Sequence, residues 1–274
     1  MINLAKITQD INDKDIKKNK LFTMFEIKTI LGFLLPAIVL ILWHVTTTIG
    51  IVPPYHLPTP VSVLNAAIDL YQRGQLFPHI AISTQRTLIG FVFGASIGFL
   101  IGTITGLSKI SDALFSPIFA ALRAVPSLAW VPMLILWLQI GEQSRVTLVA
   151  IGAFFPVYTT LVSALRNVDY QLLEMGRQFG LSNFELLKTI QLPSVIPNIV
   201  SGLRLSLAQA WLFLVAAELI ASSSGLGWLL TDSQQTGRID RIILSIVLLA
   251  TLGAFTNSIL GVCEKFLLRK WSND

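Results

Sequence analysis

Charged residues and cysteine are scarce in this chain. Aspartate, glutamate, lysine and arginine together make up 13% of its 274 residues, against about 25% in ordinary soluble domains. The single cysteine, Cys263, excludes an intramolecular disulfide, and we expect it to behave as a small hydrophobic side chain. Hydrophobic residues reach 53%. The composition therefore predicts an all-α transmembrane protein that crosses the bilayer several times.

Motifs for enzymatic chemistry are missing as well. There is no G-x-x-x-x-G-K-[ST] segment, so the chain itself is not expected to bind ATP. H-E-x-x-H is absent. The one G-x-S-x-G run, 94–98, lies inside an apolar span and not at the strand-to-helix turn that a nucleophile needs, and His44, His56 and His79 lack metal-ligand spacing. We expect no catalytic, cofactor or metal site. The net charge of +5 comes from basic residues scattered at the ends of apolar runs, which does not indicate a nucleic-acid partner.

Six apolar runs are long enough to span a membrane. We expect spans at about 29–51, 81–107, 111–139, 146–165, 198–220 and 241–263. Prolines at 117, 126 and 132 should kink the third. A polar tail, 1–28, precedes this transmembrane domain of residues 29–264, and a short basic tail, 265–274, follows it.

The second span contains five glycines in a strict four-residue repeat. Four residues advance a helix by roughly 400°, so the glycines form one slowly winding stripe. Such a stripe lets another helix backbone approach closely. We expect the partner helix to belong to the same protomer, and a second subunit is the alternative. The stripe consists of Gly90, Gly94, Gly98, Gly102 and Gly106.

Polar residues inside the spans are candidates for lining a transport pathway. Arg123 lies in the third span, and Ser206 and Gln209 lie in the fifth. Polar groups in a membrane are costly and usually face a bundle interior or water. The alternatives are a hydrogen bond to a neighbouring helix for Ser206 and Gln209, and an arginine that reaches the headgroups for Arg123. Glu218 is expected to pair with an arginine or a backbone amide rather than with substrate.

Residues 170–197 separate the fourth and fifth spans and are too polar to form another. Helix formers run from Gln171 to Phe179, and Gly180 then breaks the pattern. Ser182 or Asn183 is suited to begin a second short helix. The pattern predicts a helix–turn–helix loop outside the bilayer.

This loop resembles the EAA loop of ABC-importer permeases, whose pattern is EAA, three residues, G, nine residues, I, one residue and LP. The spacing here is complete, with methionine and glycine in place of the two alanines. The matching residues are Glu174, Met175, Gly176, Gly180, Ile190, Leu192 and Pro193. The resemblance implies a six-span, type I permease fold in which the loop is the cytoplasmic coupling helix. We expect the prolines at 193 and 197 to close this unit before the fifth span.

The resemblance also implies partners. They are a second copy of the permease, in a homodimer, two cytoplasmic ATPase subunits that hold ATP and magnesium, and a substrate-binding protein outside a bacterial inner membrane. The segments 123–137 and 215–220 are similar to the branch that imports sulfonates, taurine, nitrate and bicarbonate, most of all to aliphatic-sulfonate permeases. Any of these anions, or a solute resembling a thiamine precursor, stays open as the substrate.

Basic residues give an independent orientation. With the N-terminus inside, thirteen lysines and arginines lie on inner segments and five on outer segments or span edges. This asymmetry agrees with the positive-inside rule and predicts that both termini and the coupling loop are cytoplasmic. A secondary transporter working alone is the remaining alternative. It would need coupling-ion sites such as paired carboxylates within the spans, and none is visible.

Overall fold

The computed structural model describes residue 32 and residues 34–271, and their regular structure is entirely helical. The expected all-α class is therefore confirmed for the described residues. The expected tail, 1–28, and the start of the first expected span lie outside them. The helices are an apolar one at Leu34–Thr48, then α2 Pro60–Gln72, α3 Leu76–Leu107, α4 Lys109–Ala124, α5 Ser127–Leu138, α6 Glu142–Arg166, α7 Tyr170–Gln178, α8 Asn183–Leu186, a π-helix Leu187–Gln191, α9 Leu192–Ala221, α10 Leu226–Gln235 and α11 Ile239–Trp271.

The chain divides into two compact units, one up to Leu64 and one from Asn65 onward. In the first unit, the indole N–H of Trp43 donates a 2.9 Å hydrogen bond to the carbonyl of Pro58. This bond ties the helix at Leu34–Thr48 to the segment that follows it. The second unit contains α3 to α11 and carries all the features discussed below.

Four helices of the described chain are long and apolar enough to cross a bilayer: Leu76–Leu107, Glu142–Arg166, Asn183–Ile220 and Ile239–Lys265. The third expected span is not the single kinked helix that was predicted. It consists of α4 and α5, which are bent by 105° relative to each other. Val125 is extended, with ψ 124°, because proline at the next position disfavours helical geometry. Counting this pair as one span gives five among the described residues, where the first expected span is represented by the shorter apolar helix Leu34–Thr48.

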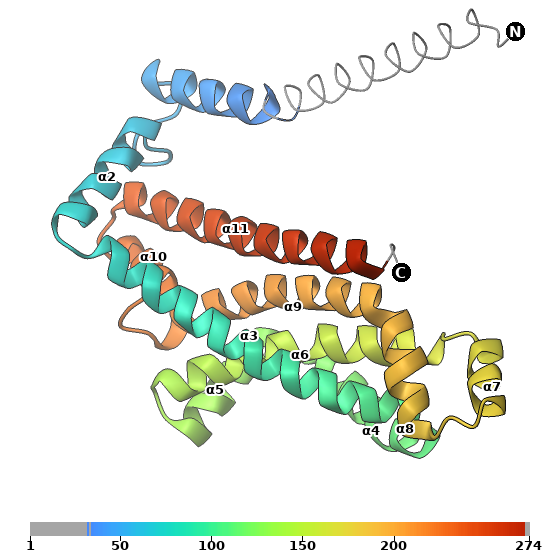
Figure 1. Ribbon diagram of the computed structural model, residues 1–274. Helices are drawn as coiled ribbons and strands as arrows, with labels where there is room; N and C mark the ends of the chain where they lie inside the picture. The colour runs from blue at the N-terminus through green and yellow to red at the C-terminus, as the bar shows by residue number, and fades with distance from the viewer. Residues whose placement is uncertain (1–31, 33, 272–274) are drawn as a thin grey trace, which may run out of the picture. The chain divides into compact units, whose positions relative to one another are not determined.

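Helix α6 runs alongside α3 and α9 in the second unit (Figure 1). The glycine stripe of α3 lies against α6. A Cβ added to Gly94 would stand 2.1 Å from the carbonyl oxygen of Ala150, and one on Gly98 would stand 2.7 Å from that of Phe154. The two backbones thus touch where the stripe runs. The structure places the partner of the stripe within the same protomer.

The other side of α6 packs against α9. Val149 and Ala153 of α6 form a buried cluster with four residues of α9: Leu207, Ala210, Trp211 and Leu214. Small side chains at the centre of this seam bring the helices close together. As a result α6 is the most buried of the candidate spans, with 61% of its apolar window buried against 17% for α11.

The second helix of the loop does not end at Pro193, contrary to expectation. From Asn183 the chain continues through the π-helix into α9 without a break. Pro193 is the second residue of α9, directly after the π-helix, so it lies within this continuous helix and cannot donate a backbone hydrogen bond there. At the other end, α11 continues past the expected span end to Trp271, so most of the expected C-terminal tail is helical.

Candidate functional site

The loop between α6 and α9 has the helix–turn–helix form that the sequence predicts. The carboxylate of Asp169 accepts a 2.9 Å bond from the backbone N–H of Gln171 and begins α7. Gly180 has φ +80°, the left-handed conformation that ends the helix. Ser182, rather than Asn183, caps α8, and its hydroxyl and Glu185 form a reciprocal capping box.

Gly176 holds the two halves of this loop together. It is buried, and an added Cβ would lie 2.5 Å from Leu186 and 2.6 Å from Ile190. Two members of the motif, Gly176 and Ile190, therefore meet at the contact between α7 and the following helix. Glu174 and Met175, the two motif residues before it, are exposed.

The outward surface of the loop is rich in large apolar side chains. Their exposed fractions are 62% for Tyr170, 44% for Leu172, 54% for Met175, 81% for Phe179 and 73% for Phe184. Exposed apolar groups gathered next to charged ones are typical of a docking surface for another protein.

Arg123 and Gln209 line one cavity of about 450 Å³ between α4, α5, α6 and α9. Among the described residues, no hydrogen bond or ion pair joins either side chain to another. Ser206, expected beside them, does not line this cavity. It is fully buried, and its hydroxyl donates a 2.6 Å bond to the carbonyl of Ala153 on α6. For Ser206 the alternative of a helix–helix hydrogen bond is the correct one.

A row of polar residues on α6 continues from this cavity. Thr159, Ser163 and Asn167 are four residues apart and so share one face of the helix. Thr159 also lines the cavity that contains Arg123 and Gln209. Thr159, Ser163 and Asn167 together line two further cavities, of about 360 and 510 Å³. We call this row with its three cavities the polar track. The four-residue spacing was visible in the sequence, but it was not noticed there.

The polar track extends toward the coupling loop. Its middle cavity includes Arg123 and Arg166, and its last cavity includes Asp169, Ser194 and Asn198. Arg166 is paired with Asp112. Arg123 is therefore the guanidinium on this track without a partner among the described residues.

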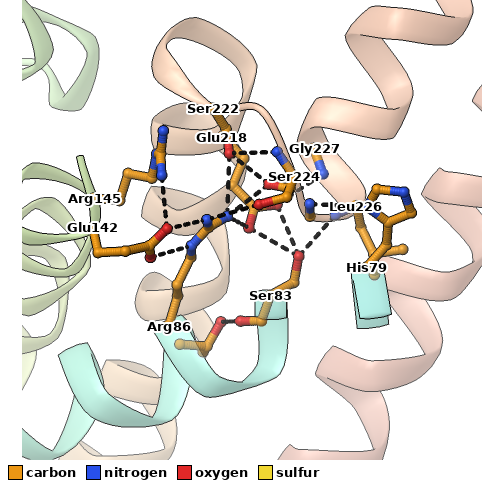
Figure 2. A network of polar contacts seen from close by, with 12 residues as sticks. His79, Ser83, Arg86, Glu142, Arg145, Glu218, Ser222, Ser224, Leu226 and Gly227 are labelled. Atoms are coloured by element: carbon orange, nitrogen blue, oxygen red, sulfur yellow. Dashed lines mark hydrogen bonds and ion pairs between the residues drawn. The ribbon is translucent and has the colours of Figure 1, made fainter. Parts of the chain in front are cut away.

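A second polar cluster lies at the opposite ends of α6 and α9, where Glu218 is buried completely (Figure 2). Its carboxylate accepts bonds of 2.7 Å from Arg86 Nη1, 2.8 Å from the hydroxyl of Ser83 and 2.9 Å from the backbone N–H of Gly227. Glu218 was expected to pair with an arginine or a backbone amide, and it pairs with both. The sequence did not reveal which arginine.

Arg86 is engaged on every side. Its Nε donates to Glu142 at 2.7 Å and its Nη2 donates to the other carboxylate oxygen at 2.5 Å. Its Nη1 also donates to the carbonyl of Ser224 at 2.7 Å. Glu142 in turn accepts from Arg145 at 2.8 Å. Two arginines and two glutamates give no net charge, so this cluster compensates itself and offers no free cation to a solute.

The same cluster contains serine, histidine and glutamate, but not in a hydrolytic arrangement. The hydroxyl of Ser83 donates to Glu218 and accepts from the N–H of Leu226. His79 Nδ1 accepts from the N–H of Gly225 at 3.1 Å, and its ring stacks on Trp228. A nucleophile needs a base within hydrogen-bond reach. Here the serine is bonded to the carboxylate instead, which fixes the turn that begins α10.

Residues 79–269 match the family described as the binding-protein-dependent transport system inner membrane component. The chain belongs to this family. The matched range contains the loop between α6 and α9, the polar track and the cluster around Arg86. The chain is thus the permease subunit of an ABC importer in the inner membrane, and ATP hydrolysis belongs to a separate subunit.

Similar proteins cover most of this permease. The provisionally named aliphatic sulfonates transport permease protein SsuC of Bacillus subtilis (strain 168) is 40% identical over 88% of this chain and 87% of its own length. The protein of the same name in Escherichia coli (strain K12) is 36% identical over 86% and 89%. The taurine transport system permease protein TauC of that strain is 29% identical over 79% and 80%.

Among solved structures, a chain of the MetNI methionine ABC transporter in an inward-facing conformation superposes with a TM-score of 0.57. The alignment covers 68% of this chain and 95% of that one at 19% identity. This likeness shows that the permease has the same helical fold.

Family membership also implies a binding protein and ATPase subunits as partners. In the described part of the permease, no three metal-ligating side chains lie together.

Proposed function

We propose that this permease forms the pathway for a small oxyanion, and that the oxyanion is an alkanesulfonate. The observation that carries the proposal is the guanidinium of Arg123, which lines the cavity beside Gln209 and has no acidic partner among the described residues. A permanent, planar cation attracts an oxyanion without depending on pH. The similarity to permeases named for aliphatic sulfonates points to the same class of solute.

The proposed assembly has two copies of this chain. One chain carries one coupling loop, and a homodimer provides one loop for each of two ATPase subunits. Each protomer has six spans in the type I arrangement, with the helix at Leu34–Thr48 as part of the first and α4 with α5 as the third. Both termini are inside, and ATP and magnesium are held by the ATPase.

The loop passes the movement of the ATPase to the spans. The residues involved are those of the motif, Glu174, Met175, Gly176, Gly180, Ile190, Leu192 and Pro193. The exposed apolar surface of α7 and α8 suits a cleft on the ATPase. The contact at Gly176 and the unbroken helix from α8 into α9 support this transmission, because α9 lines the cavity that holds Gln209.

Uptake by a strain that carries only this system tests the proposal. We expect ATP-dependent uptake of labelled alkanesulfonates, and an ATPase that co-purifies in equal number with the permease. Preferred uptake of taurine, nitrate or bicarbonate would correct the solute within the anion class. Transport of a neutral or cationic solute alone, such as one resembling a thiamine precursor, would refute the anion proposal. A pure permease that transports without an ATPase would indicate a secondary transporter.

A further inference from the structure

We infer that the cavity at Arg123 is the head-group half of a two-part solute site, whose other half is an adjoining apolar cavity for an aliphatic tail. This inference rests on the proposed function and deepens it. It assigns the permease its own site for an amphiphilic anion, with a compact oxyanion at one end and an alkyl chain at the other.

The apolar cavity has a volume of about 320 Å³ and lies between α3, α4, α5 and α6. Thr147 supplies the one polar side chain of its lining, and no charged residue lines it. Four residues belong to the linings of both cavities: Leu122, Trp130, Ile151 and Phe155. The two spaces therefore share a wall, with Arg123 and Gln209 on one side of it and apolar surface on the other.

The chemistry of the two halves differs in the way an alkanesulfonate requires. Arg123 offers several N–H donors in a fixed plane, and Gln209 offers an amide N–H, to the oxygens of the head group. The tail, placed beyond Trp130 against Ile97 and Phe119, leaves water for apolar surface. Nitrate and bicarbonate have no tail to place. Taurine would bring an ammonium group into the apolar half, where an unpaired charge is costly.

An anionic phospholipid shares this chemistry, since it also joins an oxyanion to alkyl chains. We favour a transported solute over a lipid because the head-group cavity is continuous, along Thr159, with the other two cavities of the polar track. Thr159 lines the cavity of Arg123 and also the two cavities that lead toward the coupling loop. A polar continuation serves a solute that must leave the site, whereas a lipid needs an apolar one.

Direct binding to the assembled permease and ATPase, without the binding protein, tests the inference. Butane-, pentane- and hexanesulfonate are titrated calorimetrically into the complex in phosphatidylcholine nanodiscs, with empty nanodiscs as the blank. We expect affinity to rise about threefold to fourfold per methylene, the factor for burying one CH₂ group. Hexylammonium, with the same tail and the opposite charge, should not bind.

Variants separate the two halves. Arg123→Gln should lower the affinity for every chain length by the same factor, about tenfold, and Arg123→Lys should retain most of it. Thr147→Phe fills the apolar half and should reduce the gain per methylene to less than twofold. Ile97→Phe is a second filler, on α3, in case the first variant folds poorly. Trp130→Ala should also weaken tail binding, and Trp137→Ala, on the same helix but outside both cavities, should not.

Four outcomes would overturn the inference. One is a gain in affinity per methylene that stays unchanged in both Thr147→Phe and Ile97→Phe. Another is binding of hexylammonium as tight as that of hexanesulfonate. The third is sulfonate affinity that falls as phosphatidylglycerol replaces phosphatidylcholine, which would make the cavity a lipid site. If wild-type cells take up alkanesulfonates while the complex binds none of them, the inference fails and the proposed function stands. If they take up none, the proposed function itself fails.

Discussion

Replacing Gly94 by alanine should separate two helices that now touch. The added Cβ would lie 2.1 Å from the carbonyl oxygen of Ala150 and 2.9 Å from its Cα, and ordinary contact begins near 3.4 Å. Both atoms belong to backbone, so no side-chain rotation relieves the clash, and α3 must move by about 1 Å from α6. Such overpacking costs about 1–3 kcal/mol. The better helix propensity of alanine offsets about 1 kcal/mol of it.

Gly102 on the same stripe provides the matched control. There an added Cβ would be 3.3 Å from its nearest neighbours on Tyr158, so a shift of a few tenths of an ångström suffices. Thermal unfolding of the two purified variants in one detergent measures the difference. The propensity gain is the same in both variants, so we expect Gly94→Ala to unfold at a Tm at least about 2 °C below that of Gly102→Ala. Equal Tm values for Gly94→Ala and Gly102→Ala would refute the close contact of α3 with α6.

Two other substitutions test the polar cluster and the loop. Arg86→Gln leaves Glu218 as a buried charge without its cation, which costs about 3–5 kcal/mol, so the yield of folded permease should fall sharply in size-exclusion chromatography. Glu142→Gln should change that yield little, because the side chain of Glu142 is 61% exposed; similar losses for both variants would contradict this account. Gly180→Leu forces a branched side chain to φ +80° at a cost of about 1–2 kcal/mol and should uncouple ATP hydrolysis from uptake. Asparagine adopts that φ more readily, so Gly180→Asn should keep ATP hydrolysis coupled to uptake. Normal uptake by Gly180→Leu would contradict the assignment of this loop as the coupling element.

Local patterns predicted part of this structure well. The stop at Gly180 depends on neighbouring residues alone, so the sequence was sufficient to predict it. For the cap of α8 the sequence left Ser182 and Asn183 open, and the structure has Ser182. The four-residue glycine repeat likewise identified a surface for close packing. The resemblance of the loop to the EAA motif was enough to identify the family, which the match over residues 79–269 confirms.

Features that depend on distant residues escaped the sequence. Arg86 and Glu218 are 132 positions apart, and no periodicity connects them. Ser206 was a candidate for the pathway because it is a polar residue in an apolar span. In the structure it lies between α6 and α9, and its hydroxyl donates a hydrogen bond to the carbonyl of Ala153. The break between α4 and α5 was also missed, since a proline in an apolar run predicts a kink without giving its size.

The residues of the polar cluster around Arg86 are synthesised far apart in time. Arg86 leaves the ribosome 56 residues before Glu142 and 132 residues before Glu218. At about 5–20 residues per second, the second interval lasts roughly 7–26 s. During that time the arginine has Glu142 as its earliest counter-charge, on the helix that also meets the glycine stripe. The contacts of Gly90 to Gly106 follow the order Val149 to Leu165, so α3 and α6 run parallel. These two helices can therefore pair in the bilayer before α9 is added.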